Sequence, residues 1–163
     1  AEVLSCTNAH LAPRLGGDTF FSASYIIVDP EHNTLRLSRA GHEPPLLFNA
    51  RRDPPLTSLA PAGMVIGVDK TNNRFSSSIQ EQDLQLIPGD VIFQYTDGLS
   101  EASNRKKEEF GVPRIEMLME KHGHMSTQEI LNVMYESVFA FVGDLEQEDD
   151  ITMVIVKYLG PDA

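Results

Sequence analysis

Hydrophobic and polar positions along the first third of the chain alternate with a period of two. Residues 20–28 and 34–38 show this alternation on either side of a turn-like segment at 29–33, which predicts a β-hairpin. A third strand is predicted from Leu46, where two preceding prolines indicate an edge or a bend. This part of the chain is therefore expected to form antiparallel strands.

The middle of the chain mixes loop and strand patterns. Residues 49–73 are rich in proline and glycine, and the apolar patch at 64–68 is expected to anchor this loop against the core. Residues 74–80 are interpreted as a polar strand, with Phe75 and Ile79 facing inward.

A short, strongly apolar strand follows. Residues 84–86 alternate again, and a Pro-Gly-Asp turn at 88–90 leads into the apolar run at 91–95. Asp97 stands just after this run and is followed directly by Gly98. The glycine permits a sharp turn or a close approach of another backbone.

Helical spacing dominates at the start and in the last third. Residues 2–12 and 113–122 have apolar positions three and four apart, and a capping box at Ser126 opens a longer amphipathic helix. A helical turn followed by a mobile loop is predicted over 100–111. The last strand, 151–158, is apolar on both faces and is therefore predicted to be central in its sheet.

The order of elements predicts the fold class. A helix, about seven strands mostly in hairpins, two helices and a final strand are typical of an α+β fold rather than an alternating parallel one. The number of strands favours two packed antiparallel β-sheets flanked by helices. With 163 residues, the chain is expected to form a single domain over 1–163.

Composition narrows the function classes. The formal net charge of −11 argues against nucleic acid as a partner, because phosphate backbones need a basic surface. No apolar stretch reaches the length of a membrane span, so no membrane insertion is expected. Cys6 is the only cysteine, which excludes an internal disulfide and makes a cytoplasmic location the default.

Two acidic positions flank the two most apolar strands. Asp97 follows the strand at 91–95, and Asp149 precedes the strand at 151–158. If these strands are antiparallel neighbours, both carboxylates lie at one rim of the sheet, where they could bind a hard divalent cation. The alternative is that each aspartate only caps a turn. No histidine cluster accompanies them, so magnesium or manganese is favoured over zinc.

Five motifs occur in an order that resembles a known family. They are Ala40-Gly41-His42-Glu43-Pro44-Pro45-Leu46-Leu47, Leu86-Ile87-Pro88-Gly89-Asp90, Tyr95-Thr96-Asp97-Gly98-Leu99-Ser100-Glu101-Ala102, Phe110-Gly111 and Asp149-Asp150-Ile151-Thr152. Over nearly the whole chain, their order and spacing resemble the SpoIIE/RsbU-type branch of the metal-dependent PPM serine/threonine protein phosphatases.

The resemblance implies a fold, a metal site and a reaction. The fold is the PPM-type α-β-β-α sandwich, and Asp97 and Asp149 correspond to metal ligands, with Gly98 and Asp150 as further candidates at the Mn²⁺ or Mg²⁺ site. The implied catalytic residues are Asp97 and Asp149, acting through two bound metals. A water activated by the metals would hydrolyse phosphoserine or phosphothreonine.

Two positions depart from the family pattern. The family's first metal motif, G-D-x-x-G-H-G, is absent from these 163 residues, and its nearest string, Gly17-Asp18, lacks the glycine-histidine continuation. Either this chain is the C-terminal, larger part of a domain, or it is a member that lost the motif. Lys107 stands where the family usually has glycine, in a loop that could contact substrate.

The resemblance also implies partners. The expected substrate is a phosphorylated bacterial regulatory protein, such as an STAS-type anti-sigma-factor antagonist in stress-response signalling, and a sensor or receiver domain is expected upstream. Activity is expected from the complete domain rather than from this chain alone. The alternative is a non-catalytic PPM-like interaction module with an incomplete metal site.

Overall fold

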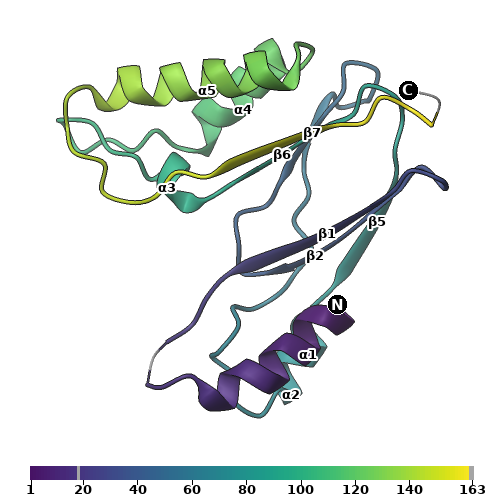
Figure 1. Ribbon diagram of the computed structural model, residues 1–163. Helices are drawn as coiled ribbons and strands as arrows, with labels where there is room; N and C mark the ends of the chain where they lie inside the picture. Colours follow the sequence, from purple (N-terminus) through teal and green to yellow (C-terminus); the bar gives the residue numbers. More distant parts are fainter. Residues whose placement is uncertain (18, 162–163) are drawn as a thin grey trace. The chain divides into compact units, whose positions relative to one another are not determined.

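The computed structural model describes residues 1–17 and 19–161, which form two compact units (Figure 1). The first unit contains, of the described residues, 1–17, 19–44 and 59–87 together with Gly160 and Pro161. The second unit contains Pro45–Ser58 and Pro88–Leu159. Within the described residues, no helix has both the length and the apolar character needed to cross a membrane.

The first unit is a three-stranded antiparallel sheet with helices. Its strands, in sheet order, are β1 (Ala23–Asp29), β2 (Thr34–Ala40) and β5 (Glu81–Gln85). Its helices are α1 (Glu2–Leu11), the 3-10 turn η1 (Ala12–Arg14) and α2 (Asn73–Ser78). The core of this unit is formed by the buried side chains Leu4, Ala40, Ile66, Phe75 and Ile79. The predicted hairpin and the anchoring role of residues 64–68, through Ile66, are confirmed.

The predicted strand at 74–80 is wrong, because this segment forms helix α2. The Asp69 carboxylate accepts hydrogen bonds from the backbone N–H groups of Arg74 (2.7 Å) and Phe75 (2.9 Å), which satisfies the free donors of the first turn. These bonds, led by that from Phe75, lower the pKa of Asp69 to about 2. Phe75 and Ile79 do face inward, but a spacing of four places two residues on one face in a helix as well as in a strand.

The second unit contains a four-stranded antiparallel sheet. Its strands, in sheet order, are β4 (Leu56–Ser58), β3 (Leu46–Phe48), β6 (Val91–Tyr95) and β7 (Met153–Lys157). Its helices are α3 (Asp97–Ser100), α4 (Val112–His122) and α5 (Thr127–Val142). The predicted capping box is present, since Ser126 and Glu129 exchange side-chain and backbone hydrogen bonds at the start of α5.

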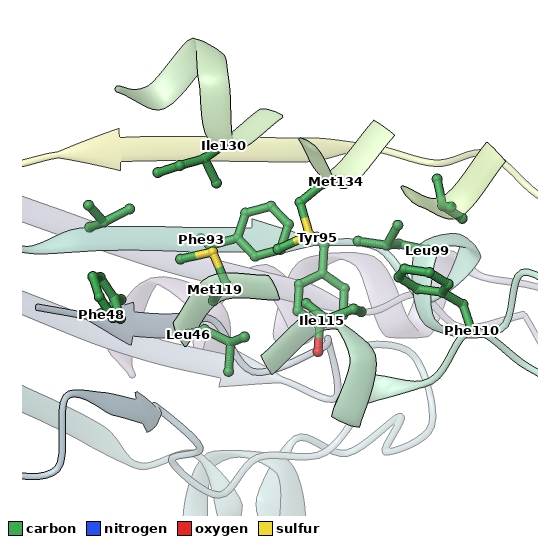
Figure 2. Packing of buried hydrophobic residues seen from close by; sticks show 12 residues of the cluster. Leu46, Phe48, Phe93, Tyr95, Leu99, Phe110, Ile115, Met119, Ile130 and Met134 are labelled. Carbon is green, nitrogen blue, oxygen red and sulfur yellow. The ribbon is translucent and has the colours of Figure 1, made fainter. Parts of the chain in front are cut away.

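One face of this sheet packs against α4 and α5 (Figure 2). Phe93 and Tyr95 of β6 point toward the helices, where Ile115 and Met119 of α4 meet them. Met134 of α5 completes this layer. All five side chains are almost fully buried, so the apolar stripes predicted for the two helices are the faces that build the core.

The last strand is not central, as its sequence had indicated. Within the described residues, β7 pairs with β6 only and lies at the edge of the sheet. Val154 and Val156, on one face of β7, are 52% and 42% exposed, so apolar residues on both faces did not indicate that both faces are buried. The number of neighbouring strands depends on the two edges of a strand, which this pattern does not describe. The short strand β4 was also missed, inside the segment interpreted as loop. The α+β class, with two antiparallel sheets and flanking helices, is confirmed.

A buried ion pair holds the start of β6. Asp90 is fully buried and accepts hydrogen bonds from Arg52 Nε (2.8 Å) and Nη2 (2.5 Å) and from Asn49 Nδ2 (3.0 Å). The carboxylate raises the pKa of the Arg52 guanidinium. The backbone N–H of Tyr158 donates to the Asp90 carbonyl. This bond joins the residue that follows β7 to the start of β6.

Candidate functional site

The two acidic segments meet at one end of the second unit's sheet. Strands β6 and β7 are antiparallel neighbours, which is the condition on which the sequence argument depended, and Tyr95 lies opposite Met153. Beyond this pair, Thr96 N–H donates to the Thr152 carbonyl (3.1 Å) and Thr152 N–H donates to Thr96 Oγ1 (2.9 Å). The Thr96 hydroxyl donates to the Asp150 carbonyl (3.0 Å). The threonines therefore join the segments that carry Asp97 and Asp149.

Gly98 brings the two backbones into close contact. A Cβ atom at this position would lie 2.5 Å from the Asp150 carbonyl oxygen and 3.4 Å from the Asp149 carbonyl carbon. No side chain fits at such a distance unless the backbone moves. Gly98 lies in the short helix α3, so glycine is needed here for space.

Both carboxylates are exposed and form local hydrogen bonds. Asp97 Oδ1 accepts from Gly98 N–H (3.1 Å), and Asp149 Oδ1 accepts from Asp150 N–H (2.8 Å). This is the turn-capping role that the sequence left open, and each bond uses one of the two oxygens. The remaining oxygens are hard donors of the type that Mg²⁺ and Mn²⁺ prefer.

The described residues do not assemble a full ligand set. Within residues 1–17 and 19–161, no group of three or more His, Cys, Asp or Glu side chains is arranged to hold a metal. Asp97 and Asp149 therefore fit a cation in chemistry and placement but provide only part of its coordination. Asp18, in the string nearest to the absent motif, lies outside the described residues.

A pocket of about 640 Å³ adjoins this end of the sheet. We call it the acidic groove. Its floor is apolar and contains Val138, Phe139, Val142, Leu145 and Ile151. Its rim carries Glu101, Glu109, Glu146, Glu148 and Asp149. Gly98 and Asp149 line it directly, so the groove opens onto the candidate metal site.

Sequence reasoning did not identify the groove. Its lining comes from α3 and the loop after it, from the last turns of α5, and from the segment before β7 (Figure 1). One usable signal was the acidic segment 144–150 directly after an amphipathic helix. Phe139, which is 39% exposed, could be recognised as part of the groove only in the folded protein.

The loop after α3 is an ordered turn. Phe110 N–H donates to the Ala102 carbonyl (2.8 Å), and Gly111 N–H donates to the Ser100 carbonyl (2.8 Å). The helical turn predicted within 100–111 lies earlier in the chain, at α3 (Asp97–Ser100), and shares only Ser100 with the predicted range, whereas the predicted mobility of the loop stays a prediction. Lys107 has φ = 61°, in the left-handed region that favours glycine, so the departure from the family pattern falls where a side chain is least favoured.

If the intact protein has the phosphatase activity that the motif resemblance implies, we expect Gly98→Ala to reduce that activity roughly 10- to 100-fold, because the new Cβ pushes the Asp149–Asp150 backbone away from Asp97. Turnover of p-nitrophenyl phosphate measures this effect. The control is Gly16→Ala, where no atom lies within 4 Å of the added Cβ and activity should not change. Full activity in Gly98→Ala would show that the close contact does not position the aspartates.

The two antiparallel sheets with flanking helices are the fold that the motif resemblance implies, and the sequence comparison identifies the family. Residues 1–159 match the family described as Stage II sporulation protein E (SpoIIE). The match covers nearly the whole chain. The protein therefore belongs to the SpoIIE family, as the motifs had indicated.

Two curated proteins are similar in sequence. Protein IcfG of Synechocystis is 29% identical over 153 residues, which span 92% of this chain and 23% of that protein. The phosphoserine phosphatase RsbU of Bacillus subtilis is 24% identical over 160 residues, which span 96% of this chain and 44% of that protein. The chain thus spans less than half the length of either relative.

Solved structures show the same fold. The SiaA-PP2C domain of Pseudomonas aeruginosa superposes with a TM-score of 0.81 at 21% identity, covering 97% of this chain and 60% of that one. A structure of the PP2C phosphatase domain of Bacillus subtilis SpoIIE with a fragment of its regulatory domain gives a TM-score of 0.72 at 20% identity, covering 94% and 42%. At these identities the likeness establishes the fold alone.

Proposed function

We propose that the complete protein is a metal-dependent serine/threonine protein phosphatase that acts on a bacterial regulatory phosphoprotein. The observation that carries this proposal is the meeting of Asp97 and Asp149 at the paired ends of β6 and β7, beside the acidic groove. Membership of the SpoIIE family supports it. A relative named as a phosphoserine phosphatase supports it further.

In this proposal, Asp97 and Asp149 hold Mn²⁺ or Mg²⁺ through their hard carboxylate oxygens. The bound cations would supply an activated water and positive charge for the phosphoryl oxygens. The chain's own contribution is positioning, since the Thr96 and Thr152 hydrogen bonds and the close contact at Gly98 fix the two segments. Asp150 supports this arrangement through its backbone carbonyl. Further ligands would be water, backbone carbonyls or side chains outside the described residues.

The proposed function also includes a protein substrate and a regulatory domain. The substrate would be a phosphorylated STAS-type anti-sigma-factor antagonist, and a sensor or receiver domain would regulate the phosphatase. One solved structure supports an association between this type of phosphatase domain and other regulatory domains. It contains the RsbU and RsbW domains of a single Mycobacterium tuberculosis protein, and it is similar in fold to this chain (TM-score 0.70, 21% identity). The cytoplasmic location is proposed on the same basis.

The test is metal dependence of the intact protein. Hydrolysis of p-nitrophenyl phosphate and of a phosphoserine protein should require Mn²⁺ or Mg²⁺ and should fall by roughly two orders of magnitude or more when EDTA removes the metal, because cations that stabilise the developing charge supply much of the rate. Restoring Mn²⁺ should restore the rate. A protein without metal-dependent hydrolysis of either substrate would instead be the non-catalytic interaction module.

A further inference from the structure

The acidic groove has an unusual charge balance for a surface pocket. Its rim carries five carboxylates, and none of the described residues that line it is Lys, Arg or His. Arg105, in the loop between Glu101 and Glu109, is already paired, because its guanidinium donates to both oxygens of Asp144 (2.5–3.0 Å). This pair lowers the pKa of Asp144. The rim is therefore negative, with no basic group in its described lining to offset it.

The floor of the groove is apolar and partly exposed. Phe139 and Leu145 are 39% and 42% exposed, although both are large hydrophobic side chains. Tyr135, one helical turn before Phe139, is 54% exposed, and the two ring centroids lie 4.3 Å apart. An aromatic stripe on α5 thus leads into the groove. Aromatic residues exposed in this way are typical of protein-binding surfaces.

We propose that the acidic groove binds a basic, amphipathic segment of the phosphoprotein substrate. An apolar side chain of that segment would contact Phe139 and Leu145 on the floor, and its Lys or Arg side chains would pair with the rim. This inference rests on the proposed phosphatase function, and it names the substrate feature that the enzyme selects beyond the phosphate itself.

The charge and the lining of the acidic groove favour a basic, amphipathic segment over other ligands. A nucleic acid or an acidic peptide would be repelled by the five rim carboxylates. A metal ion alone would leave the apolar floor uncovered, and the described residues form no cluster of three or more metal-binding side chains. A segment lying in the groove reaches Gly98 and Asp149, which are among its lining residues. Its phosphorylated residue would then lie at the candidate metal site.

The binding test uses unphosphorylated peptides and needs no catalysis. A short fluorescent peptide that alternates leucine and lysine should bind the intact protein more tightly than the same peptide with glutamate in place of lysine. Glu109→Gln/Glu146→Gln should weaken binding of the lysine peptide about tenfold, and Phe139→Ala about tenfold. The matched control is Glu120→Gln/Glu136→Gln, which removes two exposed helical carboxylates outside the groove and should leave affinity unchanged.

The catalytic test separates this inference from the proposed function. On a phosphoserine peptide with flanking leucine and lysine, the two groove variants should raise KM about tenfold. Their rate with p-nitrophenyl phosphate should equal that of the wild type, because that substrate lacks the flanking leucine and lysine residues that would contact the groove.

Equal affinity for the lysine and glutamate peptides would overturn the inference, as would an equal loss of affinity in the control variant. Normal hydrolysis of p-nitrophenyl phosphate alongside either result would leave the phosphatase assignment intact. Conversely, selective peptide binding in a protein that hydrolyses neither substrate would keep the groove as a docking site and reject the enzyme.

Discussion

Asp97→Asn in the intact protein is expected to lower metal-dependent phosphatase activity by at least about 100-fold. The substitution keeps the size of the side chain and its hydrogen bond from Gly98 N–H, but it removes the negative charge that a hard cation requires. Because the cations provide charge stabilisation for phosphoryl transfer, a weakened metal site costs rate directly. Steady-state hydrolysis at several Mn²⁺ concentrations measures both the rate and the apparent metal affinity.

Three further substitutions test whether the loss of activity is specific to the two proposed metal ligands. Asp149→Asn should have an effect as large as that of Asp97→Asn, because it removes the other carboxylate at the same rim. Asp150→Asn should have a smaller effect, since Asp150 contributes to the site through its backbone carbonyl, which accepts from Thr96. Asp83→Asn, an exposed aspartate on β5, is the control and should retain full activity. Retained activity in both Asp97→Asn and Asp149→Asn would contradict the proposed metal site.

Much of the second unit could be predicted from the sequence, because local and long-range signals agree there. The apolar run of β6, the capping box at Ser126 and the helical spacing of α5 each favour one type of element. The pairing of β6 with β7 was the decisive step, because the sequence posed it as a condition and the structure confirms it, which places Asp97 and Asp149 at one rim. The resemblance to a phosphatase family strengthened an argument that the strand pattern had already begun.

The errors in the first unit and at β7 have physical causes. Helix α2 is formed by hydrogen bonds from its first turn to Asp69, a residue that lies before the segment and is not part of its hydrophobic pattern. Strand β4 has only three residues, which is too short for alternation to be recognised. The position of β7 at an edge depends on which strands are its neighbours, a property that its own sequence does not carry.

The candidate site also has a part that could be predicted from the sequence and a part that could not. Asp97, Gly98 and Asp149 could be found because each is adjacent in sequence to a strand whose pairing is predictable. The acidic groove could not, because its floor and rim come from segments that are brought together only when α5 packs on the sheet. Phe139 belongs to an ordinary amphipathic helix in the sequence, and only its exposure in the folded protein distinguishes it from the buried Met134.

Asp90→Ala is expected to lower the free energy of unfolding by about 3–5 kcal/mol, the largest effect on stability that we predict. The Asp90 side chain has no exposed surface, and its two oxygens accept three hydrogen bonds from Arg52 and Asn49. Without the carboxylate, the guanidinium of Arg52, which is 24% exposed, and the buried amide of Asn49 lose the hydrogen bonds that Asp90 accepts, in an environment with little water. Urea denaturation followed by circular dichroism measures the change.

A second Asp–Arg pair in the same chain provides the matched control. Asp83 also accepts two hydrogen bonds from an arginine, Arg36, at 2.7 and 2.8 Å, but both side chains are more than half exposed. Because water replaces the lost partner at an exposed pair, Asp83→Ala should change stability far less than Asp90→Ala does. Equal effects of the two substitutions would mean that burial does not determine the strength of these pairs, and that the start of β6 does not depend on the Asp90 carboxylate.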